Sequence, residues 1–269
     1  MSKKASVNFF RLHGKTAFIT GATGYFGSKF SLTLARHGAH VIINGRNLKK
    51  LESLRKKIKL KGGSVSIANF DILNFNDLKK FTSKIKKIDI LINNAYDSSA
   101  NQKSRNLKKY NENFYKSFLI NVLAANNLIK NLEKKLTRNV KSKQTSSVIN
   151  IGSIYGIRCP DFGVYEAKQN PNPEYYGSSK AALIQLTKYY SVKLAKKKIR
   201  VNTISPGAFP NKDTIKKFPI FAKKILKKIP LQRIGTPEDL LSAVLYLSSE
   251  SSSYVTGTNI KIDGGWSAW

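Results

Sequence analysis

The sequence of 269 residues contains a single cysteine, Cys159, so it cannot form an intrachain disulfide. This scarcity excludes a disulfide-stapled secreted scaffold and a cysteine-rich metal cluster, and it favours a reducing compartment, which we expect to be the cytoplasm. No stretch approaches about 20 uninterrupted apolar residues, so we expect no membrane-spanning segment. The first residues include lysines but no apolar core, which predicts that there is no signal peptide.

Acidic residues are also scarce, because 15 Asp and Glu stand against 48 Lys and Arg, a formal net charge of +33. Such a charge raises nucleic acid, a membrane face or an anionic substrate as partners. The basic residues are 39 Lys and only 9 Arg, whereas base-reading surfaces favour arginine with interleaved aromatics. The lysine runs at 56–61, 84–87 and 196–198 fall at the ends of predicted helices, where cations complement the helix dipole. We therefore expect a solvated basic surface without a nucleic-acid or membrane partner, whose field attracts anionic small molecules.

Short β-rich runs alternate with longer helical stretches along the chain, and 41% of its residues are hydrophobic. This alternation is typical of βαβ units, and the nearly continuous apolar strands indicate a sheet covered on both faces. We predict a single α/β domain over 1–269, a doubly wound parallel sheet of about seven strands with helices on both faces. The predicted strands are 16–20, 40–44, 64–68, 88–92, 147–151, 200–204 and 259–262, and the predicted helices are 26–38, 47–61, 75–87, 111–135, 175–197 and 237–249.

Three stretches interrupt this alternation, at 95–110, 156–174 and 205–236. The first is rich in Asn and Ser, the second holds three of the eight prolines, and the third combines proline with short helical pieces. All three follow strands, and ligands of open parallel sheets bind outside the carboxyl ends of the strands. We therefore expect these stretches to form substrate loops.

A glycine-rich turn, TGATGYFG at 20–27, links the first predicted strand to the first helix. Glycine allows a tight turn and a close approach of the backbone to a pyrophosphate, which the helix N-terminus then binds through its free N–H groups. The strand before, the helix after and the next strand about 20 residues on provide the expected context for a dinucleotide site.

The end of the second predicted strand indicates which dinucleotide binds. Sites for NAD usually place an acidic residue here to bind the ribose 2′-hydroxyl, yet no Asp or Glu occurs between Gly21 and Glu52. Arg46 stands there instead and suits a 2′-phosphate. The sequence therefore favours NADP, with NAD as the alternative.

An ordered set of motifs makes the chain resemble the short-chain dehydrogenase/reductase family over nearly its full length. The set comprises TGATGYFG at 20–27, Asp71, NNA at 93–95, Asn121, Ser153, YGSSK at 176–180, SPG at 205–207, RIGTPEDL at 233–240 and TGTNIKIDGG at 256–265.

The resemblance implies a Rossmann-type oxidoreductase that transfers a hydride between a nicotinamide and a carbonyl or alcohol, without a metal. It implies that Ser153, Tyr176 and Lys180 are catalytic and that Asn121 holds a water connected to Lys180. The implied cofactor-binding residues are Thr20, Gly21, Thr23, Gly24, Tyr25, Phe26, Gly27, Arg46, Asp71, Ile72, Asn93, Ala95, Tyr176, Lys180, Pro206, Gly207 and Phe209.

The chemistry supports these roles independently of the family. Transfer of a hydride to a carbonyl needs a proton donor at the oxygen, and a tyrosine with its ordinary pKa near 10 exchanges protons inefficiently at neutral pH. Tyr176 and Lys180 are four residues apart on a predicted helix and share a face, so we expect the ammonium to lower the phenol pKa. Ser153 can add a hydrogen bond to the same oxygen.

The chain departs from the usual family pattern in three places. Its glycines are spaced GxxGxxG instead of the commoner GxxxGxG. Tyr96 stands where a glycine usually follows NNA, so its ring either narrows the pocket or packs. Ser153 and Tyr176 are 23 positions apart, more than is common, and the additional residues belong to the 156–174 loop.

The character of this loop, with NNAY and PGAFPN, is similar to a subgroup that acts in surface-sugar or flagellin-glycan biosynthesis. A sugar or sugar derivative is thus the first expected substrate. The alternatives are a 3-oxoacyl-carrier-protein reductase, a general alcohol dehydrogenase or, outside the enzymes, a cofactor-binding regulator. The resemblance also implies a homodimer or homotetramer formed through the helices at 111–135 and 175–197.

Overall fold

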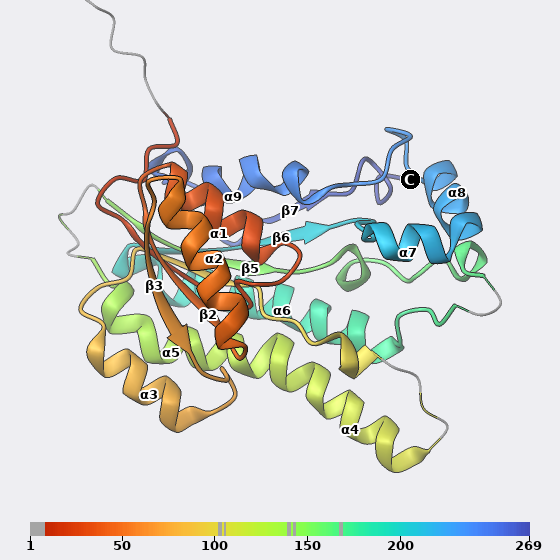
Figure 1. Cartoon of the computed structure of the whole chain (residues 1–269), viewed down its shortest axis with the longest axis horizontal. Coiled ribbons are helices and arrows are strands. Elements are labelled where there is room, and N and C mark those ends of the chain that lie inside the picture. Colours follow the sequence, from red (N-terminus) through yellow and green to blue (C-terminus); the bar gives the residue numbers. More distant parts are fainter. Residues whose placement is uncertain (1–8, 102–103, 105, 139–140, 142–143, 167–168) are drawn as a thin grey trace, which may run out of the picture.

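The structure is a computed structural model of the whole chain, and it describes residues 9–101, 104, 106–138, 141, 144–166 and 169–269. The strands of this described part form one parallel sheet in the order β3-β2-β1-β4-β5-β6-β7, which confirms the predicted doubly wound architecture (Figure 1). The seven described strands are β1 (Thr16–Ile19), β2 (His40–Gly45), β3 (Ser64–Asn69), β4 (Ile90–Asn93), β5 (Ser146–Ile151), β6 (Ile199–Pro206) and β7 (Asn259–Ile262).

Burial along the strands follows their place in the sheet. Every residue of the central strands β4, β5 and β6 is buried, as a strand between two helical layers requires. The edge strand β3 is more exposed, since its positions alternate between exposed and partly or fully buried as successive side chains point to opposite faces. The predicted strand limits agree with the observed ones to within two residues.

Helices cover both faces of the sheet (Figure 1). One layer contains α1, α2 and α9, with Phe30, Leu51 and Val244 in its core, and the other contains α3, α5 and α6, with Leu78 and Leu128 in its core. The helices are α1 (Gly27–Arg36), α2 (Leu48–Leu60), α3 (Phe75–Lys84), α4 (Leu107–Phe118), α5 (Ala124–Leu136), α6 (Glu174–Lys193), α7 (Lys212–Lys217), α8 (Pro219–Lys228) and α9 (Leu241–Ser248).

The helix predicted over 111–135 differs from the observed one. It begins four residues earlier, at Leu107, and its middle is a π-helical turn over Leu119–Leu123 that joins α4 to α5. Such a turn contains one more residue than an α-helical turn, and it often marks a functional position. Here it carries Asn121, which hydrophobic periodicity alone does not reveal.

The predicted loops gather beyond the carboxyl ends of the strands. There α7 and α8 lie at one end of the molecule (Figure 1), and a third apolar cluster of Ile154, Val164, Phe221, Ile225 and Trp266 joins α8 to the 156–174 segment and the C-terminal residues. This cluster is separate from the two cores that pack on the sheet.

Polar contacts also fasten the 156–174 segment to α8. The Nζ of Lys228 lies 2.9 Å from Asp161 Oδ2, and the Nζ of Lys224 donates to the Gly163 carbonyl at 2.9 Å. The Phe221 N–H donates to Glu166 Oε1 at 2.9 Å, at the beginning of α8. The 156–174 segment and α8 therefore pack together as one unit beyond the carboxyl ends of the strands.

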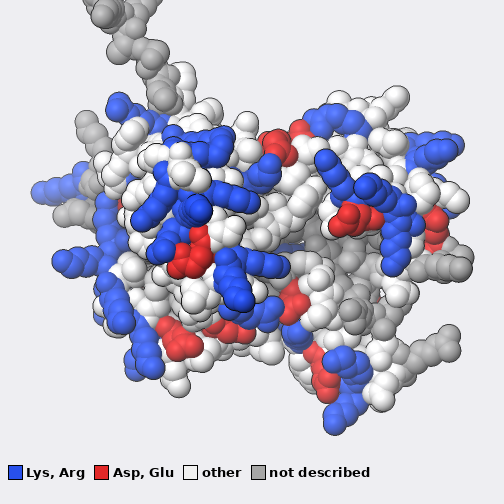
Figure 2. All heavy atoms as spheres, viewed as in Figure 1, with Lys and Arg blue, Asp and Glu red and all other residues white. Residues whose placement is uncertain are grey.

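Basic side chains are spread over the face shown in Figure 2, with acidic side chains in small groups among them. This distribution agrees with a solvated basic surface. Within the described residues, no helix combines the length and the apolar character needed to cross a membrane.

Candidate active site

The glycine-rich turn packs tightly against the end of β4. Gly21 has a φ of +59°, and a Cβ there would lie 2.8 Å from the Ala95 Cα. A Cβ on Gly27 would lie 2.3 Å from the Gly21 carbonyl oxygen. The Thr20 hydroxyl accepts the N–H groups of Asn94 and Ala95, both at 3.0 Å. The turn thus needs glycine to bring backbone close to the neighbouring loop and to a ligand.

A cavity of about 690 Å³ extends from this turn to Ser153 and Tyr176. It lies where the loops gather, outside the carboxyl ends of the parallel strands. The predicted site residues that line it are Gly21, Thr23, Gly24, Tyr25, Phe26, Arg46, Asp71, Ile72, Ala95, Ser153, Tyr176, Lys180, Pro206, Gly207 and Phe209.

Four predicted site residues do not line this cavity. Thr20, Asn93 and Asn121 border a small adjacent cavity of about 10 Å³, which Lys180 also lines. The Nδ2 of Asn93 donates to Asn150 Oδ1 at 2.7 Å, so this amide ties β4 to β5. Gly27 acts by letting α1 approach the turn.

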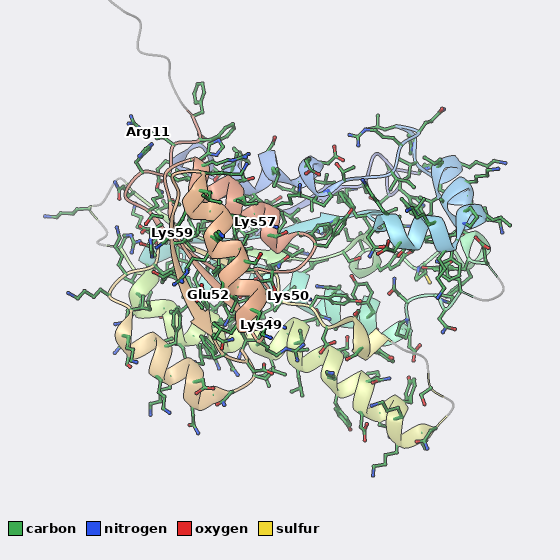
Figure 3. The ribbon with its side chains drawn as sticks, viewed as in Figure 1. Arg11, Lys49, Lys50, Glu52, Lys57 and Lys59 are labelled. Atoms are coloured by element: carbon green, nitrogen blue, oxygen red, sulfur yellow. The ribbon has the colours of Figure 1, made fainter. Side chains whose placement is uncertain are left out.

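The rim near β2 carries charges of both signs. Arg46 Nη2 lies 3.3 Å from Asp97 Oδ2, and Arg46 Nη1 lies 3.9 Å from Asp71 Oδ2. Lys50, in the first turn of α2, also lines the cavity. Figure 3 shows Lys50 near the beginning of that helix, with Lys57 and Lys59 toward its other end.

The predicted catalytic residues meet at the other end of the cavity. Tyr176 and Lys180 lie on α6, and Lys180 Nζ is 5.9 Å from the centroid of the Tyr176 ring. Lys180 Nζ donates to the Ile151 carbonyl at 2.8 Å, which anchors the side chain to the end of β5. Ser153, at the end of β5, lines the same cavity as Tyr176 and Lys180, and its hydroxyl acts to lower the pKa of Tyr176. The structure thus brings the predicted trio together.

Burial changes the proton affinities of this pair. It lowers the pKa of Lys180 from 10.5 to about 7, because the ammonium is removed from water. Burial also raises the pKa of Tyr176 above its ordinary value, although the hydrogen bond from Ser153 opposes that shift. The expectation that Lys180 lowers the Tyr176 pKa is therefore wrong for this structure, since desolvation is the larger influence on both groups.

Asn121 is held on the π-helical turn by its amide nitrogen. Its Nδ2 donates to the Ser179 hydroxyl at 3.0 Å and to the Ser117 hydroxyl at 3.3 Å. Its Oδ1 is buried and has no hydrogen-bond partner among the described residues. The 10 Å³ cavity between Asn121 and Lys180 is about the size of one water molecule, which fits the role expected for this residue.

The cavity also has lining residues that the sequence reasoning did not single out. They include Lys50 and Asp97 on the rim, and Gly152, Ile154, Tyr155, Tyr165, Gln169, Asn170, Asn172, Ala208, Pro210, Thr214, Phe221, Ile225 and Trp266 around the catalytic end. Tyr96 lines the cavity too, with its ring edge-on to Tyr176 at 5.8 Å between centroids. The loop predictions indicated the segments involved but not which of their side chains point inward.

Known proteins resemble this chain over nearly its whole length. Residues 21–267 match the family model described as Enoyl-(Acyl carrier protein) reductase. The chain belongs to the short-chain dehydrogenase/reductase family. It is 37% identical over 256 residues to the 3-oxoacyl-[acyl-carrier-protein] reductase FabG of Rickettsia conorii, and the match covers 94% of this chain and 97% of that protein.

Solved structures of the family share the fold. A short-chain dehydrogenase/reductase from Mycobacterium marinum superposes with a TM-score of 0.81 at 30% identity, covering 97% of this chain and 98% of that chain. Pseudomonas aeruginosa RhlG, solved as a complex with NADP, gives a TM-score of 0.83 at 27% identity, covering 96% and 98%. The chain is therefore an NAD(P)-dependent oxidoreductase that acts on CH–OH groups, which disfavours the alternative of a non-enzymatic regulator.

Proposed function

We propose that this enzyme uses NADPH to reduce a carbonyl group, and that its substrate is a 3-oxoacyl group on an acyl carrier protein. The observation that carries the proposal is the single cavity that joins the glycine-rich turn to Ser153, Tyr176 and Lys180. The similarity to FabG of Rickettsia conorii favours this substrate over a surface sugar.

The residues around the turn fit an NADP molecule. A side chain at Gly21 or Gly27 would collide with the neighbouring backbone. Glycine at these positions therefore allows the tight turn whose backbone can approach a pyrophosphate closely. Arg46 and Lys50 supply positive charge at the rim for a 2′-phosphate. The relative RhlG was solved with NADP, which supports the same choice. When bound, the nicotinamide supplies the hydride.

Residues of this chain then bind and protonate the carbonyl oxygen of the substrate. Tyr176 donates a proton to the oxygen of the carbonyl, and Ser153 donates a hydrogen bond to it. Lys180 binds the nicotinamide ribose. Asn121, held by Ser179, positions a water that connects Lys180 with solvent.

The charge of the enzyme supports an acyl carrier protein as the carrier of the substrate. Acyl carrier proteins are acidic, and a net charge of +33 attracts an acidic partner over a distance of about one Debye length. The attraction weakens as the salt concentration rises, whereas binding of a free neutral substrate does not depend on it. The salt dependence of kcat/KM therefore distinguishes a carrier-bound substrate from a free neutral one.

The test follows NADPH oxidation with acetoacetyl and crotonyl groups, each on an acyl carrier protein and on the neutral carrier N-acetylcysteamine. We expect reduction of the acetoacetyl thioesters and not of the crotonyl ones, with the preference for the protein carrier falling as salt increases. Tyr176→Phe is the inactive control. Reduction of crotonyl in place of acetoacetyl, or of neither, contradicts the proposal.

A small hydroxylated ketone, such as a sugar derivative, is a second candidate. It is favoured by the aromatic and amide side chains that the 156–174 segment presents to the cavity, namely Tyr165, Gln169, Asn170 and Asn172. Aromatic faces pack on the C–H faces of sugars, and amides bind hydroxyl groups. Higher kcat/KM for keto-sugars than for acetoacetyl thioesters would establish this candidate instead.

We also propose that copies of this chain pair through α4, the π-helical turn and α6. Large apolar side chains are exposed there, including Tyr115, Leu119 and Leu123 on one stretch and Tyr189 and Val192 on α6. Contiguous apolar side chains on a surface mark an interaction site. Light scattering should give the mass of a dimer or tetramer, whereas a monomer at micromolar concentration contradicts the pairing.

A further inference from the structure

The helices α7 and α8 border the substrate end of the main cavity. Thr214 of α7 lines this cavity, as do Phe221 and Ile225 of α8. The two α8 side chains also pack in one apolar cluster with Ile154, the residue that follows Ser153. A molecule that binds on the outer side of these helices is therefore close to the catalytic centre.

The outer side of the two helices is basic. Asp213 is the one acidic residue between 205 and 236, and it stands beside Lys212 at the beginning of α7. Figure 2 shows basic side chains over the end of the molecule where α7 and α8 lie. We define the α7–α8 lysine surface as the exposed residues Lys216, Lys217, Lys223, Lys224, Lys227 and Lys228.

The protein itself neutralises little of this charge. Among the residues that the structure describes, Lys228 is the only member of the α7–α8 lysine surface in an ion pair, with Asp161 at 2.9 Å. Lys223 and Lys227 are four residues apart on α8, a spacing at which like charges repel. An acidic partner would relieve this repulsion, so the surface favours a negatively charged ligand.

The cofactor end of the cavity has a different charge pattern. There Arg46 lies next to Asp71 and Asp97, so both signs of charge meet at the rim. The proposed NADP occupies that end, and the carrier of a substrate must approach from another side. The α7–α8 lysine surface offers mainly one sign of charge beside the substrate end.

We propose that the α7–α8 lysine surface is the docking site of the acidic acyl carrier protein that delivers the substrate. The inference rests on the proposed reduction of a 3-oxoacyl group and names the surface that binds its carrier. An acyl carrier protein presents the acyl group at the end of a flexible arm. A carrier docked on these helices can therefore place that group in the cavity that the same helices line. Complementary charge at such a surface speeds association and selects the partner.

The experiment reverses charge on this surface without changing a residue that lines the cavity. The variant is Lys223→Glu/Lys227→Glu. Lys224 and Lys228 are left unchanged, because they hold the 156–174 segment. Lys223→Gln/Lys227→Gln removes the two charges without reversing them, and it decides the same question if the first variant does not fold.

The matched control is Lys80→Glu/Lys84→Glu on α3. These two lysines are also exposed and four residues apart, and they form no ion pair within the described part of the chain. Figure 1 shows α3 at the opposite end of the molecule from α8. Both double reversals lower the net charge equally, so the comparison distinguishes a docking surface from the general positive field.

Two quantities are measured for each protein with the cofactor present. The first is the ratio of kcat/KM for acetoacetyl on an acyl carrier protein to kcat/KM for acetoacetyl on N-acetylcysteamine. The second is the dissociation constant, by calorimetry, of the carrier protein without an acyl group. Both are measured at about 10 mM salt, where the Debye length is about 30 Å, and at about 1 M salt, where it is about 3 Å.

We expect Lys223→Glu/Lys227→Glu to lower the kcat/KM ratio about fivefold or more at low salt and to weaken carrier binding by a similar factor. The glutamine variant should show a smaller loss in the same direction. Both losses should vanish at high salt, and kcat/KM for the neutral thioester should match wild type. The α3 variant should change the ratio by less than about twofold.

Three results overturn the docking surface even where acetoacetyl reduction stands: an equal loss in the α3 variant, no loss in the α8 variants, or an equal loss on both carriers. Carrier binding that depends on the α8 lysines in a protein that does not reduce acetoacetyl groups supports the docking surface and overturns the proposed substrate. A protein that neither binds the carrier nor reduces the thioesters contradicts both proposals.

Discussion

Arg46 and Asp97 form an ion pair at the cavity rim, with 3.3 Å between Arg46 Nη2 and Asp97 Oδ2. The same carboxylate oxygen lies 3.1 Å from Lys116 Nζ, and Asp97 Oδ1 accepts the Ser99 N–H at 3.0 Å. Burial opposes ionisation of Asp97, but the hydrogen bonds from Ser99 and the ammonium of Lys116 outweigh it and hold the pKa at about 2. Asp97 is therefore a fixed anion that, in the proposed NADP complex, would compete with the 2′-phosphate for Arg46.

Replacing this competitor should strengthen NADPH binding. Asp97→Asn keeps the side-chain size but removes the charge that pairs with Arg46 and repels a phosphate. We expect the dissociation constant of NADPH to fall about two- to fivefold, the range for a partly exposed ion pair, with that of NADH nearly unchanged. Fluorescence titration measures both constants, and Asp77→Asn on α3 is the matched control. Weaker NADPH binding in Asp97→Asn would show that Asp97 positions Arg46 instead.

Removing Arg46 should have the opposite effect. In the proposed complex, Arg46→Ala would eliminate a charge-assisted hydrogen bond to the 2′-phosphate, which is worth about 1.5–3 kcal/mol. The dissociation constant of NADPH should then rise more than tenfold, while that of NADH stays close to the wild-type value. Arg55→Ala is the control, because Arg55 lies on α2, pairs with Glu52 and does not line the cavity. Equal wild-type affinities for the two cofactors would refute the assignment of Arg46.

Tyr176→Phe should separate proton transfer from binding. The variant keeps the ring, so it should fold and bind cofactor normally while kcat falls roughly 10²–10⁴-fold. Tyr175→Phe is a strict control, because Tyr175 is buried away from the cavity and packs on Tyr110 and Phe114. Near wild-type turnover in Tyr176→Phe, or an inactive Tyr175→Phe, would overturn the residue assignment.

The sheet and the catalytic trio could be predicted because their signals are local. The central strands are continuous apolar runs, and Tyr176 and Lys180 share a helix face by spacing alone. The glycines at 21 and 27 likewise show their role through a motif next to a strand and a helix.

Other features depend on partners far along the chain. The pairing of Arg46 with Asp97 joins residues 51 positions apart, and neither neighbourhood predicts it. The raised pKa of Tyr176 follows from its burial in the folded chain, which spacing on α6 cannot reveal. The stacking of Tyr165 on Phe221 of α8 likewise joins residues 56 positions apart.

The buried Lys180 should make stability depend on pH. Its pKa is about 7 in the folded chain and near 10.5 in the unfolded chain, so between these values the unfolded chain binds more protons. The contribution of Lys180 to the free energy of unfolding therefore increases from pH 7 upward, by as much as about 1.4 kcal/mol per pH unit. Denaturant unfolding of wild type and Lys180→Met from pH 6.5 to about pH 9 measures the difference. If the free energies of unfolding of wild type and Lys180→Met changed in parallel with pH, Lys180 would have the same pKa in the folded and the unfolded chain.

Shortening the 156–174 segment should change substrate choice and leave the cofactor site intact. Its described contacts include those with α8, through Asp161, Gly163 and Glu166, and one with the C-terminal residues, where Arg158 Nη1 donates to the Trp266 carbonyl at 2.7 Å. No described hydrogen bond or ion pair connects it to the glycine-rich turn.

A variant with about ten residues removed from the middle of this segment should therefore rank carbonyl substrates differently or show altered KM values. Its dissociation constant for NADPH should stay within about twofold of wild type. Asp161→Asn, which breaks only a partly exposed ion pair with Lys228, is the milder comparison and should change KM much less. If NADPH binding collapsed while the substrate ranking survived, the segment would cover the cofactor and not the substrate.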